Sequence, residues 1–203
     1  MRALDSAVTN RFDSSVAVIT YLSTGRFAIP PDDSLHLAPY QVPVKTLVLD
    51  GRLKVDISTL PMEQYYETFV NSISLAQSES TYVSLAAQGE VGTDSGFIVA
   101  KIAVDTTVPG ADLRLVAVLI EDSVRTSGIF ATRYDKVARA FLPDYLGKHF
   151  SVARLDTLCD TLRFACAGYN PAKLGAALFV KDVSSPEVLQ AAVLHRFQLK
   201  ETK

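Results

Sequence analysis

Hydrophobic and polar positions near the start of the chain follow the period of β-strands. Residues 16–22 form a continuous apolar, β-branched run, which is typical of a strand covered on both faces. Residues 44–49 and 52–57 also have strand composition, and they flank Asp50 and Gly51. An Asp-Gly pair between two such runs indicates a tight hairpin turn.

A helical period follows the hairpin. Pro61 can open a helix because its missing N–H costs nothing in the first turn. Apolar residues then recur at a spacing that places them on one face of a helix. They are Tyr66, Phe69, Val70, Ile73 and Ala76. Strands and helix together predict a small α/β lobe that ends near residue 78.

The pattern changes at the polar residues 77–80, and strand-like segments dominate the rest of the chain. Breaks rich in Gly, Pro or Ser separate most of them, as in an antiparallel β-sandwich. The expected strands are residues 82–90, 96–106, 112–120, 150–155, 161–167, 176–181 and 187–197. Residues 130–150 are expected to form a long loop with exposed aromatic side chains, a kind of segment that often binds partners.

Composition supports a folded protein of one or two domains. The chain has 203 residues, of which 48% are hydrophobic and 21% charged, so it can bury a proper core. We expect an α+β fold, with the lobe at residues 1–78 and the sandwich at residues 79–203. The formal net charge of −2 predicts no basic face, so nucleic acid is not an expected partner.

The sequence also bears on location. No run approaches the roughly 18 to 20 apolar residues that a membrane helix needs. Residues 1–6 lack the apolar core of a signal peptide. This predicts a cytoplasmic protein, or a periplasmic or outer-membrane protein if the natural start lies upstream of Met1.

Residues that carry enzyme and metal chemistry are sparse and form no motif. Cys159 and Cys166 are the only cysteines, and their spacing fits neither a zinc site nor a redox pair. We expect two buried free thiols, with a disulfide within one β-ribbon as the alternative. His36, His149 and His195 lack paired metal-ligand spacing. No cofactor and no metal are therefore expected.

Two carboxylate pairs have simple structural interpretations. Asp32 and Asp33 are expected to lie in the first turn of a short helix, where acidic side chains are favoured. Glu121 and Asp122 stand at the end of a strand. A calcium site would need more oxygen ligands at regular spacing.

Residues 40–51 resemble the strand and turn that carry the cis-proline of thioredoxin-like domains. The Asp-Gly turn, Thr46 and the apolar strand match that pattern, but Lys45 stands where the family has its proline. No Cys-x-x-Cys occurs in the chain. A cis peptide before a non-proline residue costs about 2.5 to 4 kcal/mol, so we expect a trans peptide at Lys45. The resemblance implies a lobe without redox chemistry, whose substrate groove is free to become a docking surface.

Residues 169–192 resemble the closing hairpin of a bacterial family that includes outer-membrane lipoproteins. That family joins an atypical thioredoxin-like domain to an immunoglobulin-like sandwich. Residues 118–122, residues 137–143 and Gly147 are similar to its middle segment. The resemblance implies a truncated thioredoxin-like α/β lobe followed by an antiparallel immunoglobulin-like β-sandwich. These motifs place strands and turns and imply no chemistry.

The favoured interpretation is a non-catalytic, protein-binding or structural accessory subunit of a larger complex, including a membrane-associated one. The candidate partner-binding residues are Lys45, Tyr134, Phe141, Tyr145 and Phe150. In the simpler alternative for this region, Phe141, Leu142 and Leu146 cover an open end of the sandwich. Edge strands offer another docking mode, strand addition.

Two other function classes stay open at this point. The chain could be a truncated or inactive relative of a thiol oxidoreductase or lipoprotein. It could also be a sandwich that binds a small ligand or a metal.

Overall fold

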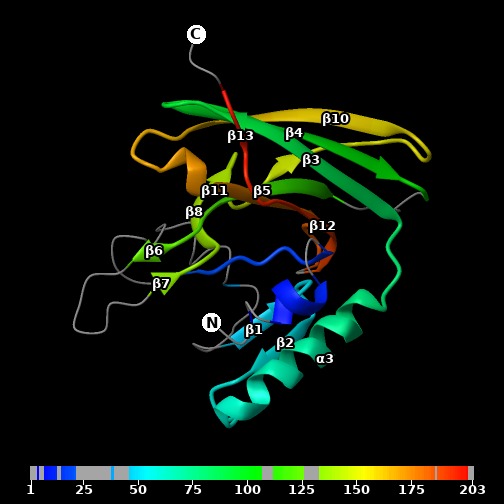
Figure 1. Cartoon of the computed structure of the whole chain (residues 1–203). Helices are drawn as coiled ribbons and strands as arrows, with labels where there is room; N and C mark the ends of the chain where they lie inside the picture. Colours follow the sequence, from blue (N-terminus) through cyan, green and yellow to red (C-terminus); the bar gives the residue numbers. More distant parts are fainter. Residues whose placement is uncertain are drawn as a thin grey trace.

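The computed structural model places two stacked β-sheets above a smaller lobe (Figure 1). It describes residues 4, 7–12, 15–21, 38, 46–106, 112–125, 133–185 and 187–200. Most strand pairs in these ranges are antiparallel, and the helix α3 (Tyr65–Gln77) lies in the lobe. The α+β class predicted from the sequence is therefore confirmed.

The hairpin predicted at Asp50 and Gly51 is present in the lobe. β1 (Thr46–Leu49) pairs antiparallel with β2 (Leu53–Asp56). Both turn residues have positive φ, 49° at Asp50 and 70° at Gly51, which matches the twist of the flanking strands. The turn also touches the sandwich, because the Val188 N–H donates to the Asp50 carbonyl at 2.9 Å.

The predicted apolar stripe forms the buried side of α3. The helix follows a 3-10 turn, η4 (Met62–Gln64), that begins directly after Pro61. Phe69 and Ile73 are fully buried and pack with apolar residues of the β1–β2 hairpin. The 3.6-residue period of the sequence therefore identified the core-facing side of this helix correctly.

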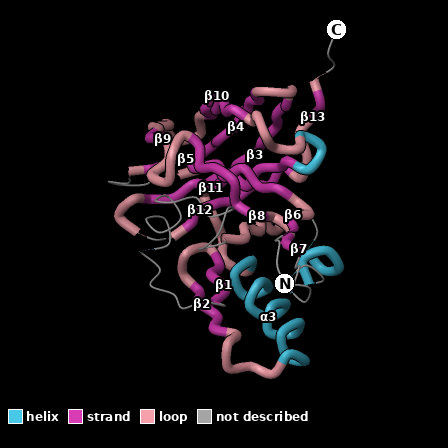
Figure 2. The backbone as a smooth tube through the Cα atoms, turned by 90° about the vertical axis from the view of Figure 1, so that its left-hand side faces the viewer, coloured by secondary structure: helices cyan, strands magenta, loops and turns pink. Residues whose placement is uncertain are grey.

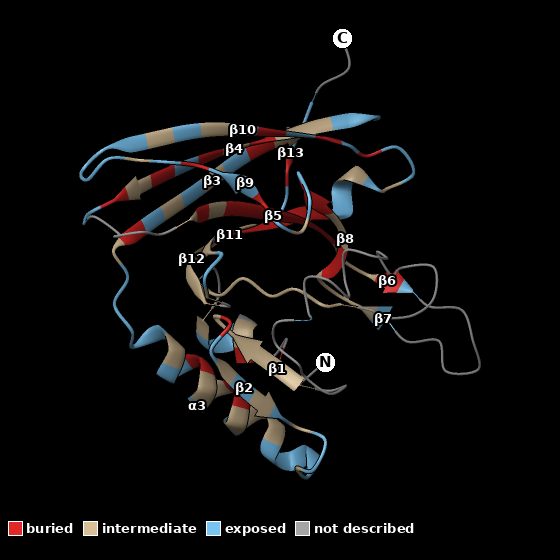
Figure 3. Cartoon of the chain, turned by 180° about the vertical axis from the view of Figure 1, so that it is seen from behind, coloured by how far each residue is buried: buried red, intermediate tan, exposed pale blue. Residues whose placement is uncertain are grey.

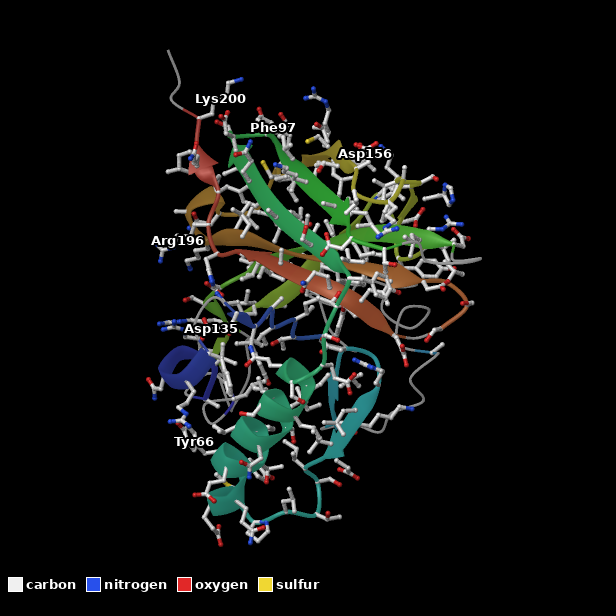
Figure 4. The ribbon with its side chains drawn as sticks, turned by 90° about the vertical axis from the view of Figure 1, so that its right-hand side faces the viewer. Tyr66, Phe97, Asp135, Asp156, Arg196 and Lys200 are labelled. Atoms are coloured by element: carbon white, nitrogen blue, oxygen red, sulfur yellow. The ribbon has the colours of Figure 1, made fainter. Side chains whose placement is uncertain are left out.

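The apolar run at residues 16–22, predicted as a strand, joins the lobe to the sandwich instead. Among its described residues, only Thr20 forms a β-bridge, parallel to Val137. The Thr20 N–H donates to the Lys136 carbonyl at 2.8 Å, and the Thr20 hydroxyl donates to the Asp135 carbonyl at 2.9 Å. Figure 4 shows Asp135 at the level where the sandwich meets the lobe.

Alternation along this run sends its apolar side chains into two different cores. Val16 and Val18 pack in the lobe with α3, after the short π-helical turn η1 (Val8–Phe12). Ile19 and Tyr21 pack on the sandwich, where the Tyr21 and Phe141 rings stack with centroids 6.1 Å apart. The two sides of this run are thus covered by two separate hydrophobic clusters, and not by packing within a sheet.

Two sheets make up the sandwich (Figure 2). The four-stranded sheet has the order β10-β4-β3-β13, and the five-stranded sheet has the order β12-β11-β5-β8, with β9 also paired to β5. Their bounds are β3 (Val83–Val91), β4 (Ser95–Val104), β5 (Leu113–Glu121), β8 (Val137–Leu142), β9 (Lys148–His149), β10 (Thr157–Ala165), β11 (Leu174–Asp182), β12 (Val188–Leu194) and β13 (Gln198–Leu199). Two further elements, the strand pair β6 (Val124–Arg125) with β7 (Arg133–Tyr134) and the 3-10 turn η5 (Pro171–Lys173), complete this part.

The central strands of the five-stranded sheet are buried on both faces (Figure 3). In β5, Leu115 and Leu119 face the four-stranded sheet in the main core. Val116 and Val118 face the other way, into a second cluster that Ile19 helps to cover. We call this second side the outer face. Its burial explains why the sequence of β5 becomes continuously apolar after an alternating start.

Two predictions for residues 130–155 are wrong. Residues 150–155 form no strand, and the following strand, β10, begins earlier than expected at Thr157. Conversely, residues 137–142, predicted to be part of a long loop, form β8 beside β5. A register shift between Leu119 and Ile120 interrupts this pairing, so neighbouring pairs of residues are buried and the usual alternation is lost.

Gly96, at the start of β4, provides a test of packing in the main core. A Cβ there would lie 2.7 Å from the Glu90 carbonyl oxygen and would overlap the Phe164 ring. We expect Gly96→Ala to lower the free energy of unfolding by about 1–3 kcal/mol, the usual cost of overpacking. Gly92→Ala is the matched control, because its Cβ would meet nothing closer than 3.4 Å. Urea unfolding measures both, and equal effects would contradict this account.

Asp50 gives a second test, based on pH. Burial raises the pKa of the Asp50 carboxyl, although the Arg52 guanidinium opposes the shift. Because the pKa of Asp50 is higher in the folded state than in the unfolded state, its ionised carboxylate destabilises the fold above about pH 4. This destabilisation disappears at lower pH, where Asp50 is protonated in both the folded and the unfolded state. We expect Asp50→Asn to raise the unfolding free energy at pH 7, with a gain that shrinks below pH 4. A gain independent of pH would assign the effect to turn preference alone.

Candidate functional site

The structure separates the five residues predicted to bind a partner. Phe141 is 4% exposed and packs on the outer face, whereas Phe150 is 7% exposed and packs between the sheets. Both rings are therefore buried, on opposite faces of the five-stranded sheet, and the exposed aromatic side chains expected from the sequence are absent at these two positions. Tyr134 in β7 and Tyr145 after β8 are half-buried. Lys45 lies outside the described residues, as does its peptide bond.

Glu121 and Asp122, at the end of β5, bind basic side chains. Glu121 lies 3.3 Å from Arg139, and both side chains are only 15% exposed. The Arg139 guanidinium also stacks 4.8 Å from the centre of the Tyr169 ring. Asp122 accepts a hydrogen bond from the Lys136 ammonium at 2.9 Å. These carboxylates therefore hold the β5–β8 connection together, which accounts for them without a cation.

Cysteines and histidines lie apart in the described part of the chain. Cys159 is exposed and Cys166 is buried, so the prediction of two buried thiols is half correct. Both are free, and an extended strand separates their Cα atoms by about 20 Å, too far for a disulfide. Burial, with a smaller effect from Asp94, raises the pKa of the Cys166 thiol. His149 and His195 are exposed, and the described residues include no group of three or more metal-ligating side chains.

The edge strand β10 is protected against pairing with another chain. The Thr161 N–H donates to the Asp160 carboxylate at 2.8 Å, and the Lys148 ammonium of β9 binds the same oxygen at 2.7 Å. Asp160 occupies an inward-facing position in β10. Inward charges of this kind are a known protection of edge strands.

The other long edge, β12, is occupied by side chains from its own neighbourhood. The Ala191 N–H donates to the Gln190 amide oxygen at 2.9 Å, and the Gln190 amide donates to the Val83 carbonyl at 3.1 Å. The Thr81 hydroxyl donates to the Leu189 carbonyl at 2.7 Å. Strand addition, the second docking mode predicted from the sequence, is therefore not favoured at β10 or β12.

One end of the five-stranded sheet brings together two basic side chains on the outer face. Arg114 of β5 and Lys181 of β11 are directly opposite in the register. The Lys181 ammonium donates to the Tyr145 carbonyl at 3.1 Å. The Arg114 guanidinium donates to both oxygens of Asp112, at 2.9 and 2.8 Å. With Asp144, these residues are the Arg114–Lys181 site.

The charge on Lys181 is only partly compensated. Burial lowers the pKa of the Lys181 amine, and the Arg114 guanidinium lowers it further, while the Asp144 carboxylate acts in the opposite direction. The ion pair with Arg114 lowers the pKa of Asp112, chiefly through their hydrogen bonds. Like charges directly opposite each other in a sheet are destabilising, so this half-buried cation pair is an unfavourable feature of the isolated chain.

The turn between β8 and β9 fixes the shape of the site. Asp144 accepts hydrogen bonds from the Leu146 N–H at 2.8 Å and the Gly147 N–H at 3.0 Å. Gly147 has a φ of +81°, and a Cβ there would lie 2.8 Å from the Leu115 carbonyl oxygen. Only glycine lets the turn approach β5 so closely. Figure 2 shows β9, which follows this turn, at the end of the sheet where β5 begins.

Apolar side chains are exposed beside the site. Leu146 is 49% exposed and Val183, just after β11, is 48% exposed. Val183 stays close to β5 because its N–H donates to the Asp112 carbonyl at 3.1 Å. With Tyr145, these two residues form what we call the apolar rim. Exposed apolar groups beside charged groups are typical of a recognition surface.

The sequence did not point to Arg114 or Lys181. Each is a single charge at the end of an apolar strand, and sheet register alone brings them together. The sequence does contain a weak signal. Arg114 and Lys181 each lie two residues from an apolar residue of the outer face, Val116 and Phe179, so each is a basic residue on the same side of its strand as a buried apolar residue. Of the four predicted residues that the structure describes, only Tyr145 belongs to this surface.

Comparisons with known proteins identify the fold and no activity. No family model matches the chain, and no curated protein matches it. The solved structure of HBP35 of Porphyromonas gingivalis is similar with a TM-score of 0.68 at 14% identity, over 84% of this chain and 59% of that one. A domain of the outer membrane lipoprotein Omp28 from the same organism matches with a TM-score of 0.45 at 15% identity, over 61% of this chain and 93% of that domain.

The HBP35 match includes more than the sandwich. Residues 79–203 make up less than two thirds of this chain, so a match over 84% takes in part of the lobe. The chain nevertheless spans only 59% of the length of that protein. Within the described residues, every helix is too short or too polar to cross a membrane.

The electrostatic description of Lys181 can be tested directly. We expect Arg114→Gln to raise the pKa of Lys181, since a repulsive charge is lost, and Asp144→Asn to lower it, since an attractive charge is lost. The measurement is a pH titration by ¹³C NMR after reductive methylation of the lysines. Glu90→Gln, a carboxylate of the four-stranded sheet, is the control. If Lys181 titrates identically in all three variants, burial alone lowers its pKa, and the account given above is contradicted.

Proposed function

We propose that the chain is a non-catalytic binding module, and that a protein partner docks on the Arg114–Lys181 site and the apolar rim. The observation that carries this proposal is that the exposed Leu146 and Val183, on two connections at the end of the sheet, lie beside an incompletely compensated cation pair. Interfaces combine an apolar centre with charged groups that select the partner. The protected edges of β10 and β12 favour docking on this face over strand addition.

We also propose a fold type for each of the two parts of the chain. The lobe would be a truncated thioredoxin-like unit, and the sandwich would be immunoglobulin-like. The Asp50–Gly51 hairpin, α3 and the antiparallel sheets support this arrangement. The resemblance of residues 169–192 to a bacterial family with lipoprotein members supports an accessory subunit of a membrane-associated complex, located outside the cytoplasm.

The placement of the cysteines supports binding over thiol chemistry. A dithiol mechanism needs two cysteines within reach of each other, and Cys159 and Cys166 are separated by most of an extended strand. The buried Cys166 has a raised pKa, which disfavours the reactive thiolate. No contact among the described residues favours the redox alternative.

The docking surface is tested by replacing one exposed leucine. We expect Leu146→Gln to reduce recovery of the partner in native co-purification several-fold, because an apolar rim residue is lost. Leu75→Gln is the matched control: Leu75 is 60% exposed on α3, in the lobe. Mass spectrometry of both purifications identifies and quantifies the partner, and thermal unfolding verifies that both variants are folded.

Two results would contradict the proposal. One is equal recovery of the same partner by both variants, which would place the interface elsewhere. The other is an isolated chain that purifies as a monodisperse monomer with no partner at all under native conditions.

A further inference from the structure

We propose that the Arg114–Lys181 site binds a carboxylate, supplied by an acidic side chain within the partner's docking segment. The inference rests on the proposed function for the source of the carboxylate, but the chemistry of the site can be tested alone. Its basis is the hydrogen-bonding state and the charge of five groups already described: Arg114, Lys181, Asp112, Asp144 and the Tyr145 carbonyl.

Lys181 has donor capacity that the described residues do not use. An ammonium group carries three N–H donors, and the one hydrogen bond seen for Lys181 goes to the Tyr145 carbonyl. The opposing charge that acts on Lys181, Asp144, already has one carboxylate oxygen occupied by the Leu146 and Gly147 N–H groups. A half-buried ammonium in this position gains most from an added anionic acceptor.

Arg114 is positioned to share that acceptor. Asp112 occupies Nε and Nη2 of the guanidinium, which holds the group flat against one side and leaves Nη1 for another ligand. Lys181 and Arg114 are directly opposite on neighbouring strands, so their side chains start about 5 Å apart. An anion between them would replace cation repulsion with two charge-assisted hydrogen bonds.

The charge of the site favours a carboxylate over a phosphate. Asp112 and Asp144 balance much of the positive charge of Arg114 and Lys181. A monoanion then adds one negative charge to a site that already holds two carboxylates, whereas a phosphate group adds close to two. A planar carboxylate also matches two donors side by side.

The apolar rim favours an internal acidic side chain over a chain terminus. Leu146 and Val183 lie on two different connections, β8–β9 and β11–β12. A partner segment with an apolar residue on each side of a Glu can contact both while the carboxylate enters the site. A terminal carboxylate has chain on one side only and would leave half of the rim uncovered.

The test uses three capped peptides and the full chain. Ac-Leu-Glu-Leu-NH₂ carries the internal carboxylate, Ac-Leu-Gln-Leu-NH₂ lacks it, and Ac-Leu-Gln-Leu-OH carries a terminal one. Binding is followed by NMR of the Lys181 Cε in protein that carries ¹³C-labelled lysine, which leaves the three ammonium N–H donors intact, and by titration of that signal with pH. We expect the Glu peptide to bind about ten-fold or more tightly than the Gln peptide and to raise the pKa of Lys181.

Variants assign the effect to the site. Lys181→Met and Arg114→Gln should each weaken binding of the Glu peptide about ten- to hundred-fold, the value of a charge-assisted hydrogen bond. Lys101→Met, an exposed lysine of β4, should not change it. If Lys181→Met fails to fold, Arg114→Gln and the Lys181 signal of the unmodified chain still decide the question.

The outcomes separate this inference from the proposed function. Equal binding of the Glu and Gln peptides would overturn carboxylate recognition, even if Leu146→Gln still loses the partner. Preference for the peptide with the free terminus would overturn the assignment to an acidic side chain. Selective Glu binding that disappears in Arg114→Gln supports the site, including in the case where no partner is recovered.

Discussion

Burial of the five-stranded sheet on both faces is the constraint on which the rest of the structure depends. β5 and β11 direct one set of side chains into the core between the sheets and the other set, including Val116, Val118 and Phe179, to the outer face. An antiparallel sandwich normally leaves its outside faces to water. Here the outer face needs a cover, and the Ile19–Tyr21 stretch of the N-terminal part provides some of it. The Arg114–Lys181 site lies at the end of this sheet, where charged residues replace the apolar residues of the outer face.

The sequence predicted the features that depend on local chemistry. The Asp50–Gly51 turn, the stripe of α3 and the approximate positions of β3, β4, β5, β11 and β12 follow from residues close together in the chain. The prediction failed where a long-range partner changes the pattern. β8 lost its alternation at a register shift against β5, and residues 16–22 satisfied a strand-like pattern by packing into two cores. The Arg114–Lys181 site could not be predicted from the sequence, because only the pairing of β5 with β11 brings these two residues together.

The polar groups of the sandwich divide into those that close the fold and those that face outward. The Glu121–Arg139 and Asp122–Lys136 pairs fix the β5–β8 connection, and Asp160 with Lys148 closes one edge. In each pair, one acid meets one base. The Arg114–Lys181 site departs from this rule, because two bases stand opposite each other. Departures from local consistency in natural proteins tend to occur at functional positions, which is why we place recognition there and not at the buried Phe141 and Phe150.

The alternation of residues 15–21 has a consequence for the unity of the molecule. One short stretch holds Val16 and Val18 in the lobe core and Ile19 and Tyr21 on the sandwich, while the Asp50 turn is hydrogen-bonded to Val188. Neither half can lose its structure without pulling apolar side chains out of the other. The lobe and the sandwich are therefore coupled through this stretch. Heat or denaturant should unfold both in a single cooperative step.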